Sequence, residues 1–530
     1  MTDQNIKTVL GEDGVLLATI DMPGRSMNVF SFEMMDSLER LVDYVNSDDR
    51  IKAVVINSAK RAFIAGADLV MVRRFTEQAK TESHEVLADT CGRLGRIFRR
   101  LERSTKPYVT AVDGLALGGG LELCLACHAR IVSDRRGVLL GLPEIKLGLL
   151  PGAGGTQRLP RVVGARLGLE MLLNGTAVNA KSALECGLVD AVVPAAELID
   201  VALQKAAALG SVVKPWDHDA SGFDSGALEL DRSGAIDRII AALGLSEQTV
   251  SRYPAFRAIM DCVLEGWNKP IDTGLNNEMD IFVRLIKDPV AGNMIRSLFI
   301  DRQRSLKALQ DVGESGEVKI GVVGEGADTL ASMLTAARAP VVAAQALSGE
   351  DVVLVTGSSP AASAATAVCV LGGSARAGNV IAGCHAGVWI GPANDHGHAV
   401  EVVSDGEPSA RAAALRVAGW LRAGAVLLTE GKVSKLAELS AVGSTQPNDD
   451  DRCLAVTLAA ARMWLAGEVA DCALFDSACV VGGVVPSYSG GPFSYLREHG
   501  ERALQARALA LGMGWPAGLV RFFDGAARGD

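Results

Sequence analysis

Short apolar runs alternate with longer amphipathic stretches along the first third of the chain. Runs rich in β-branched residues at 14–20, 51–57 and 107–113 predict strands. Residues 31–46, between the first two runs, predict a helix because apolar residues recur there at helical spacing. Strands that alternate with helices favour parallel βαβ units, so the chain is predicted to begin with an α/β domain.

The pattern changes twice further along the chain. From about 190 to 310, Gly and Pro are sparser, and stretches such as 275–287 alternate charged with apolar faces, which predicts helices. Residues 214–233 are polar and predict an exposed loop. At 318 the run VKIGVVGEG indicates a strand that leads into a glycine turn.

A chain of 530 residues is long enough for several domains. We expect a boundary near 310–317, and helical runs return in the last hundred residues. The predicted division is an α/β domain over 1–200, a helical extension and linker over 201–315, a second α/β region over 316–405 and a helical region over 406–530.

Composition narrows the classes of protein. With 52 Lys and Arg against 62 Asp and Glu, the net charge of -10 argues against a nucleic-acid partner. No run of about 18 uncharged apolar residues predicts a membrane helix, and the first residues lack the apolar region of a secretory signal. The 10 cysteines are scattered, as reduced thiols of a cytoplasmic protein would be.

The segment from Arg61 to Gly164 holds most of the candidate chemistry. It begins with the small-residue turn RAFIAGAD and continues with AVDGLALGGGLEL. The glycines 118–120 allow another group to approach the backbone closely, and they open a predicted helix whose free N–H groups point the same way. Two N–H donors from separate turns are what an oxyanion hole requires.

Two acidic residues lie in the same segment. Glu122 and Glu144 are 22 positions apart, and each alone is typical of the first turn of a helix. Together they supply the two carboxyl groups that paired proton transfers require. The glycine-rich stretch 152–155 allows a further backbone turn to approach the same site.

The runs IAGADL, ALGGGLEL and LPEIKLGLLPGAGGTQRLPRVVG resemble, in order, the motifs of the crotonase superfamily, the enoyl-CoA hydratases and isomerases. The resemblance implies a ββα-superhelix domain whose substrate is a coenzyme A thioester and which requires no cofactor. It also implies that the N–H groups of Ala67 and Gly119 form the oxyanion hole and that Glu122 and Glu144 are catalytic.

The same resemblance assigns the CoA contacts to Arg61, Ala65 and Asp68. The family carries a Lys just after the GAD turn, but this chain has Val70 there, with Arg73 and Arg74 shortly beyond. Those two arginines are equally typical of an exposed surface without a ligand.

The reaction that the resemblance implies is syn addition of water to a 2-enoyl-CoA, which gives a 3-hydroxyacyl-CoA. We assign Glu122 mainly to the water and Glu144 mainly to the proton at C2, with the two carboxyl groups coupled. The same site could also move a double bond from C3 to C2. Lipid β-oxidation is the expected setting.

Resemblance continues beyond the first domain. Residues 253–266, 297–303, the run VKIGVVGEG and residues 486–500 resemble the alpha subunits of multifunctional fatty-acid oxidation enzymes, which join a hydratase to an NAD-dependent 3-hydroxyacyl-CoA dehydrogenase. This implies a Rossmann-like α/β region, a helical C-terminal region, a homo-oligomer and a thiolase partner.

The second half departs from the dehydrogenase pattern. The third glycine of the fingerprint is replaced by Thr329, and Glu325 puts a negative charge where a pyrophosphate would lie. No acid for the ribose follows the strand predicted at 341–347. Only 66 residues, 319–384, separate the start of this region from His385, which is too few for a full Rossmann sheet, and its possible partner Glu401 lies further along than in the family.

We therefore expect no NAD binding and no dehydrogenase activity. Two alternatives stay open: a working bifunctional hydratase and dehydrogenase, or a non-catalytic acyl-CoA-binding scaffold of a β-oxidation complex.

Two further patterns have plain structural interpretations. Arginines at 93, 96, 99, 100 and 103 share one helix face, which predicts a solvated face, with an anionic partner or membrane surface as the alternative. The run Cys124-Leu-Ala-Cys127-His128 matches a haem-attachment pattern, but buried thiols within a helix are the expected role.

Overall fold

The structure is a computed structural model. It describes residues 3–210, 212–218, 235–267, 269–309, 319–324, 327–336, 339–342, 352–356, 366–371, 384–392, 398–421, 423–431 and 433–526. The chain divides into two compact units, Met1–Gly292 and Asn293–Asp530, and each is described by itself. The finer four-part division stays a prediction.

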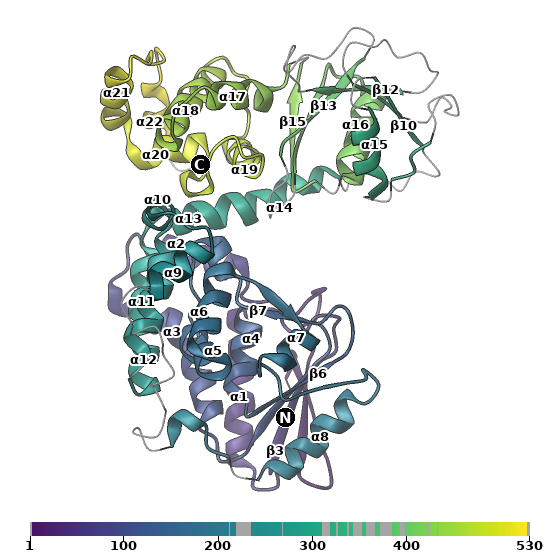
Figure 1. Cartoon of the computed structure of the whole chain (residues 1–530), viewed down its shortest axis with the longest axis vertical. Helices are drawn as coiled ribbons and strands as arrows, with labels where there is room; N and C mark the ends of the chain where they lie inside the picture. Colours follow the sequence, from purple (N-terminus) through teal and green to yellow (C-terminus); the bar gives the residue numbers. More distant parts are fainter. Residues whose placement is uncertain are drawn as a thin grey trace. The chain divides into compact units, whose positions relative to one another are not determined.

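The first unit is built on a six-stranded sheet in which the order of strands is β1-β2-β3-β4-β6-β9 (Figure 1). The first two strands form an antiparallel hairpin, and every later pair is parallel. The three strands that the sequence predicts are therefore confirmed. The strands are β1 (Ile6–Leu10), β2 (Val15–Ile20), β3 (Ala53–Ser58), β4 (Tyr108–Val112), β6 (Ala129–Ser133) and β9 (Ala191–Val193).

The first unit also contains a small second sheet, whose first strand leads into the glycine-rich motif. It contains β5 (Leu115–Leu117), β7 (Leu139–Gly141) and β8 (Ala177–Asn179) in that order. The short helix α4 (Gly119–Ala126) follows β5 after a single glycine, and all of its residues are buried. The glycine-rich motif thus lies between a strand and a helix.

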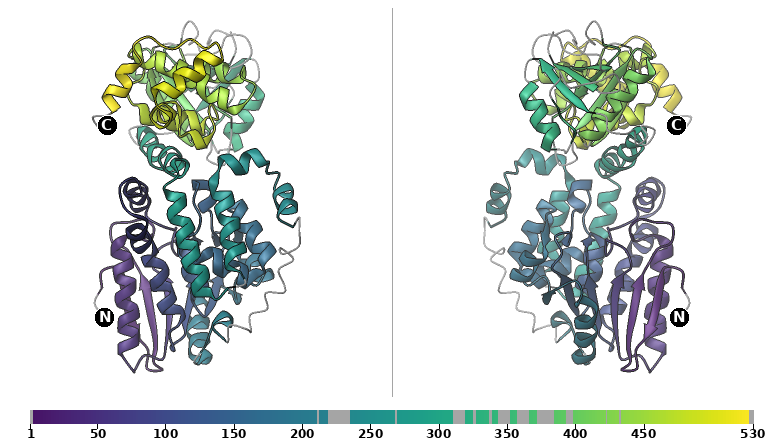
Figure 2. Two further views of the ribbon diagram at one scale, coloured as in Figure 1. Left: turned by 90° about the vertical axis from the view of Figure 1, so that its left-hand side faces the viewer. Right: turned by 90° about the vertical axis from the view of Figure 1, so that its right-hand side faces the viewer.

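Helices cover the large sheet. Figure 2 shows α1 (Phe32–Ser47) beside the strands at the start of the chain, and the Ser31 side chain caps this helix by accepting from Met34 N–H. Helix α8 (Leu198–Leu209) packs apolar residues, Leu198 among them, against strands β2, β3, β4 and β6. The remaining helices of this part are α2 (Leu69–Gln78), α3 (His84–Glu102), η1 (Glu144–Leu147), α5 (Gly155–Val163), α6 (Ala165–Asn174) and α7 (Ala180–Glu185).

The stretch predicted to be helical is confirmed where the structure describes it. It contains η2 (Pro215–Asp217), α9 (Ala235–Ala242), α10 (Glu247–Arg252), α11 (Pro254–Gly266), α12 (Ile271–Ile286) and α13 (Pro289–Ile295). The prediction of an exposed loop from 214 is wrong at its start, because Lys214 and Trp216 are buried. The cost of burying Lys214 is offset because its ammonium group donates to two carbonyls at the end of α4.

The second unit contains a sheet of six strands whose order follows the chain, from β10 to β15 (Figure 1). All pairs are parallel except β13 with β14. The strands are β10 (Ile320–Gly324), β11 (Val352–Thr356), β12 (Thr366–Leu371), β13 (Ala386–Ile390), β14 (Ala399–Ser404) and β15 (Ala425–Glu430). The last strand lies in a stretch predicted to be helical, so the sheet continues past residue 405.

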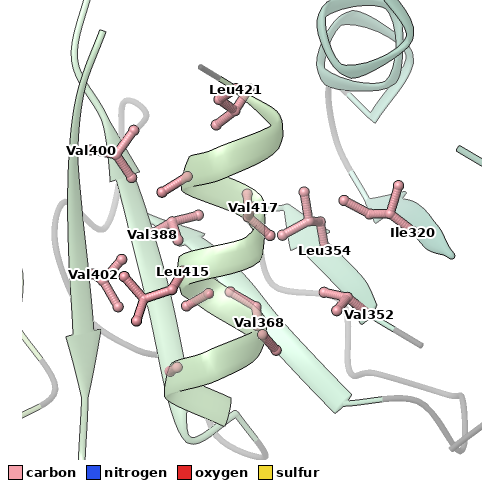
Figure 3. Packing of buried hydrophobic residues seen from close by; sticks show 14 of the residues in the cluster. Ile320, Val352, Leu354, Val368, Val388, Val400, Val402, Leu415, Val417 and Leu421 are labelled. Carbon is pink, nitrogen blue, oxygen red and sulfur yellow. The ribbon is translucent and has the colours of Figure 1, made fainter. Parts of the chain in front are cut away.

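Helices close the core of this second sheet, and α15 (Ala327–Ala336) contributes Leu330 and Leu334 to it. Figure 3 shows α16 (Pro408–Trp420) lying across the strands, with Leu415 and Val417 facing the valines of the sheet. Small residues such as Ala414 and Ala418 let this helix approach the strands closely.

Further helices complete the second unit. They are η5 (Arg296–Ile300), α14 (Asp301–Leu306), η6 (Lys307–Leu309), α15 (Ala327–Ala336), α17 (Lys435–Ser444), α18 (Asp449–Leu465), α19 (Cys472–Val481), η8 (Ser487–Ser489), α20 (Pro492–His499), α21 (Glu501–Ala510) and α22 (Val520–Ala526). Among the residues described in both units, no helix is both long enough and apolar enough to cross a bilayer.

The core of the second unit yields a stability prediction. Leu354 is fully buried in β11, whereas Leu428 in β15 is 38% exposed. We expect Leu354→Ala to lower the free energy of unfolding by about 2–5 kcal/mol, because it leaves a cavity, and Leu428→Ala to lower it by much less. Urea unfolding followed by circular dichroism tests this, and equal losses would contradict the packing described.

Candidate active site

Two turns far apart in the sequence run side by side at the site. The N–H of Phe63 donates to the carbonyl of Leu115 at 2.9 Å, and the N–H of Leu117 donates to the carbonyl of Ile64 at 3.1 Å. The N–H of Gly118 donates to Gly141 in β7. These bonds hold the segment 61–66 against the start of α4.

The glycines of the motif are required by this close approach. A Cβ atom on Gly120 would lie 2.4 Å from the carbonyl oxygen of Ile64, so no side chain fits there. Gly118 has a φ of +54°, and a Cβ on it would lie 2.7 Å from a carboxylate oxygen of Glu144. Only glycine meets both conditions at low cost.

The amides of Ala67 and Gly119 are available as donors. Phe30 pairs with this turn: its N–H donates to Gly66 and its carbonyl accepts from Asp68. In such a parallel bridge the N–H of Ala67 points to the opposite side. Gly119 is the first residue of α4, so its N–H has no partner within the helix. Neither amide has an acceptor in the part of the chain that the structure describes.

Glu122 is buried in α4, with 3% of its surface exposed. Its Oε1 accepts from the N–H groups of Ala153 and Gly155, each at 2.8 Å. Burial raises the pKa of Glu122, and the two amide donors act against that rise by stabilising the carboxylate. Glu122 is thus the acid of the pair that is equipped to carry a negative charge.

The surroundings of Glu144 differ from those of Glu122, because they lack amide donors for one of its oxygens among the described residues. It begins η1 directly after Pro143, and its Oε2 is buried without a hydrogen-bond partner among the described residues. Burial, and next the charge of Glu122, raise the pKa of Glu144 well above its usual value. Glu144 therefore favours the neutral acid, and the structure brings it close enough to Glu122 for the two charges to interact.

A third buried carboxylate, which the sequence analysis did not single out, contacts the same region. Glu278 in α12 is 1% exposed, and it accepts from the N–H groups of Gly154 at 2.7 Å and Thr156 at 3.0 Å. Burial, and next the charge of Glu122, raise the pKa of Glu278 to about 8. The available signal was an acid at a position of α12 where the helical period requires an apolar residue.

A buried ion pair holds the backbone of the turn at Ala153 in place. Arg158 in α5 makes two bonds of 2.9 Å to the carboxylate of Glu102 and donates to the carbonyl of Ala153 at 2.8 Å. Both side chains are closed off from solvent. Burial alone would raise the pKa of Glu102, but Arg158 lowers it below its usual value. This pair fixes the backbone whose amides hold Glu122.

The arginine face of α3 is only partly solvated. The prediction holds for Arg96, whose side chain is 54% exposed, but it is wrong for Arg99, which is 11% exposed. Arg99 pairs with Glu102, Asp217 and Asp272, because the helices beyond residue 210 cover this face. Arg93 and Arg100 pair with acids of α1.

The cysteines of α4 are buried thiols, as expected. Burial raises the pKa of Cys124 to about 12, and it lowers the pKa of His128 to about 4. The Nδ1 of His128 accepts from Tyr108 N–H at 3.0 Å. Within the described residues, no group of three His, Cys, Asp or Glu side chains is arranged to hold a metal ion.

The residues assigned to CoA lie around the first turn, and their contacts with CoA stay predictions. Arg61 is exposed, and the N–H of Ala65 donates to Asn28. Asp68 caps α2 and pairs with Arg25 at 2.6 Å, so its carboxylate already has structural partners. Arg73 pairs with Glu77 on the surface of α2, and the guanidinium of Arg74 lies over the ring of Phe32.

His385 and Glu401, the candidate dehydrogenase residues in the second unit, have separate partners. The Nδ1 of His385 is 3.1 Å from Asp405, and its side chain is 62% exposed. Glu401 is fully buried and accepts from Ser434, Thr429 and the first amides of α17. Glu401 thus caps a helix and is not the partner of His385. Residues 325–326 of the fingerprint and 343–347 lie outside the described residues.

Residues 11–215 match the family model described as enoyl-CoA hydratase/isomerase. This part of the chain therefore belongs to that family, the crotonase superfamily, and the predicted α/β class of the first domain is confirmed.

Known relatives extend the comparison. The chain is 38% identical over 322 residues to the fatty acid oxidation complex subunit alpha of Idiomarina loihiensis, and 36% identical over 323 residues to that of Shewanella frigidimarina. Each alignment covers 59% of this chain and 44% of the relative, so the chain spans less than half the length of these relatives. An enoyl-CoA hydratase from Geobacillus kaustophilus is 27% identical, with a TM-score of 0.36, over 48% of this chain and 95% of that chain.

The buried ion pair yields a prediction. Arg158→Met should lower the free energy of unfolding by about 3 kcal/mol or more, because it leaves the buried charge of Glu102 incompletely compensated. The double variant with Glu102→Leu should be less destabilised than Arg158→Met alone. Urea unfolding of the two variants and the parent measures this, and a double variant at least as unstable as Arg158→Met would contradict it.

Proposed function

We propose that the first unit is an enoyl-CoA hydratase that adds water syn across a 2-enoyl-CoA thioester. The observation that carries this proposal is the contrast between two neighbouring buried acids. Glu122 has two amide donors on one oxygen, whereas Glu144 has a buried oxygen that bonds to none of the described residues. One acid suits the role of base and the other that of proton donor.

The amides of Ala67 and Gly119 would receive the thioester oxygen. Negative charge collects on that oxygen when water attacks C3, and each fixed donor in a dry site stabilises it by about 3 kcal/mol. The close contact of the two turns supports this role, since both donors are fixed before the substrate arrives. The positive end of α4 adds to the same effect.

The proton transfers balance within the pair of acids. The Glu122 carboxylate accepts a proton from water as the water oxygen bonds to C3, and neutral Glu144 gives its proton to C2 as the enolate collapses. The product is 3-hydroxyacyl-CoA, with Glu122 protonated and Glu144 ionised. Return of a proton from Glu122 to Glu144, directly or through solvent, restores the starting state.

A second activity of the same site is movement of a double bond from C3 to C2. This isomerisation needs an enolate held by the same amides and an acid that carries a proton between C2 and C4. The Oε2 atom of Glu144 supports it, because no described residue forms a hydrogen bond with that oxygen.

The first test is Glu144→Gln. We expect kcat for hydration of crotonyl-CoA or a longer enoyl-CoA to fall by about 100- to 10,000-fold, since the proton donor is lost. Loss of enoyl absorbance measures the rate. The matched control is Glu185→Gln, at a side chain that is 62% exposed, which should retain full activity. Turnover of Glu144→Gln near that of the parent would refute the assignment.

For the second unit we propose that the Rossmann-like region does not function as an NAD-dependent dehydrogenase. A doubly wound sheet binds its dinucleotide where the order of strands reverses. Val341 pairs in parallel with one edge of β10 and β11 pairs with the other edge, so the order of strands reverses at β10. The fingerprint that follows β10 nevertheless departs from the dinucleotide-binding pattern, because it carries Glu325 and has Thr329 in place of the third glycine. The exposed His385 and the helix-capping role of Glu401 support the same conclusion. A thiolase partner, a homo-oligomer and a cytoplasmic setting stay predictions.

The dehydrogenase proposal has its own test. With 3-hydroxyacyl-CoA and NAD, we expect no formation of NADH above the rate without enzyme, while the same preparation hydrates enoyl-CoA. The absorbance of NADH measures it, and a bifunctional relative serves as the positive control. Reduction of NAD at ordinary enzyme rates would overturn the proposal.

A further inference from the structure

The turn from Ala153 to Thr156 donates its successive amides in alternation to two different carboxylates. The N–H groups of Ala153 and Gly155 donate to Glu122, and those of Gly154 and Thr156 donate to Glu278. Thr156 also donates its hydroxyl group to Glu278. A backbone that alternates in this way lies between the two acids, so a shift toward either one weakens its bonds to the other.

We propose that Glu278 is a positioning residue for the hydration reaction, which holds the turn 153–156 and thereby the carboxylate of Glu122. This inference rests on the proposed function. Glu278 belongs to α12, outside the segment 11–215 that matches the family model. The helical extension therefore supplies part of the active site of this chain.

The packing around Glu278 makes this role specific. The ring of Phe282, one turn further along α12, lies 3.0 Å from where a Cβ on Gly152 would be, so the helix rests directly on the turn. A cavity of about 760 Å³ between α3 and α12 borders the turn at Gly152 and Gly154. Without Glu278, no other buried acid among the described residues accepts from Gly154 and Thr156.

The charged groups around Glu278 come from every element packed against it. Glu122 and Glu144 lie toward the catalytic side, and Arg158 is the nearest cation. The others are Arg161 in α5, Cys262 in α11, His84, Glu85, Asp89, Arg96, Arg99 and Glu102 in α3, and Asp272 and Asp280 in α12.

Glu278 also influences the acid of the pair. Its negative charge, when present, raises the pKa of Glu144 and so keeps that group protonated to higher pH. Removal of the charge should lower the pKa of Glu144. Because the reaction needs neutral Glu144, the fall of kcat/KM on the alkaline side should then begin at lower pH.

The decisive variant is Glu278→Gln, measured as a pH profile of enoyl-CoA hydration. A glutamine offers one acceptor oxygen and no charge, so one amide of the turn loses its partner. We expect kcat to fall about 10-fold, as when a functional residue loses a group that orients it. KM should change little. The alkaline limb of kcat/KM should move to lower pH by about half a unit or more.

Two matched variants separate positioning from loss of structure. Glu278→Asp keeps the charge, so its alkaline limb should match that of the parent while kcat falls, because the carboxylate is one methylene short. Asp280→Asn removes an exposed charge from the same helix and should change neither quantity. If Glu278→Gln does not fold, the Asp variant still decides: an unchanged kcat contradicts the proposal, and a reduced kcat with unchanged KM supports it.

The outcomes distinguish the two proposals. A parent protein that does not hydrate enoyl-CoA contradicts the proposed function. An active parent whose Glu278→Gln variant is folded and keeps the same kcat and pH profile contradicts only the role of Glu278.

Discussion

The arrangement of the first unit depends on the amides of one turn, Ala153 to Thr156, which are shared between two buried carboxylates. A buried carboxylate is costly unless donors replace its lost water. The alternating N–H groups meet that need for Glu122 and Glu278 together. Arg158 supports the turn from its carbonyl side, and its charge is balanced by Glu102. The position of the Glu122 carboxylate is therefore set by backbone geometry as much as by its own helix.

Three buried carboxyl groups in one region cannot all ionise, since like charges at close range disfavour one another. The surroundings decide which of them carries the charge. Glu122 has two amide donors, whereas one oxygen of Glu144 has no hydrogen-bond partner in the described parts of the chain. Glu278 has amide and hydroxyl donors, but burial and the charge of Glu122 raise its pKa to about 8. The asymmetry that acid and base chemistry requires thus comes from hydrogen bonding and burial, because all three side chains are chemically alike.

The sheet of the second unit is stabilised by an apolar core and by buried side chains that cap helices. Its valines and the helix α16 form a continuous core, and Glu401 and Asp476 cap helices from buried positions. These features stabilise the fold irrespective of any ligand. A dinucleotide site needs, in addition, a glycine turn where the order of strands reverses. Here the order reverses at β10, and the sequence that follows this strand carries Glu325 and has Thr329 in place of the third glycine.

The sequence by itself determined three strands of the α/β unit, β2, β3 and β4, and its first helix, because apolar spacing follows directly from which face is buried. Its motifs also indicated Glu122, Glu144 and the two glycine-dependent turns, since close backbone contact demands glycine at fixed positions. Only the tertiary structure decided that Glu278, Arg158 and Glu102 hold the site together, and that β15 extends the second sheet. The bonds of Glu278 to Gly154 and of Arg158 to Glu102 join residues more than 50 positions apart, and no local pattern of spacing or propensity specifies which buried acid meets which amide.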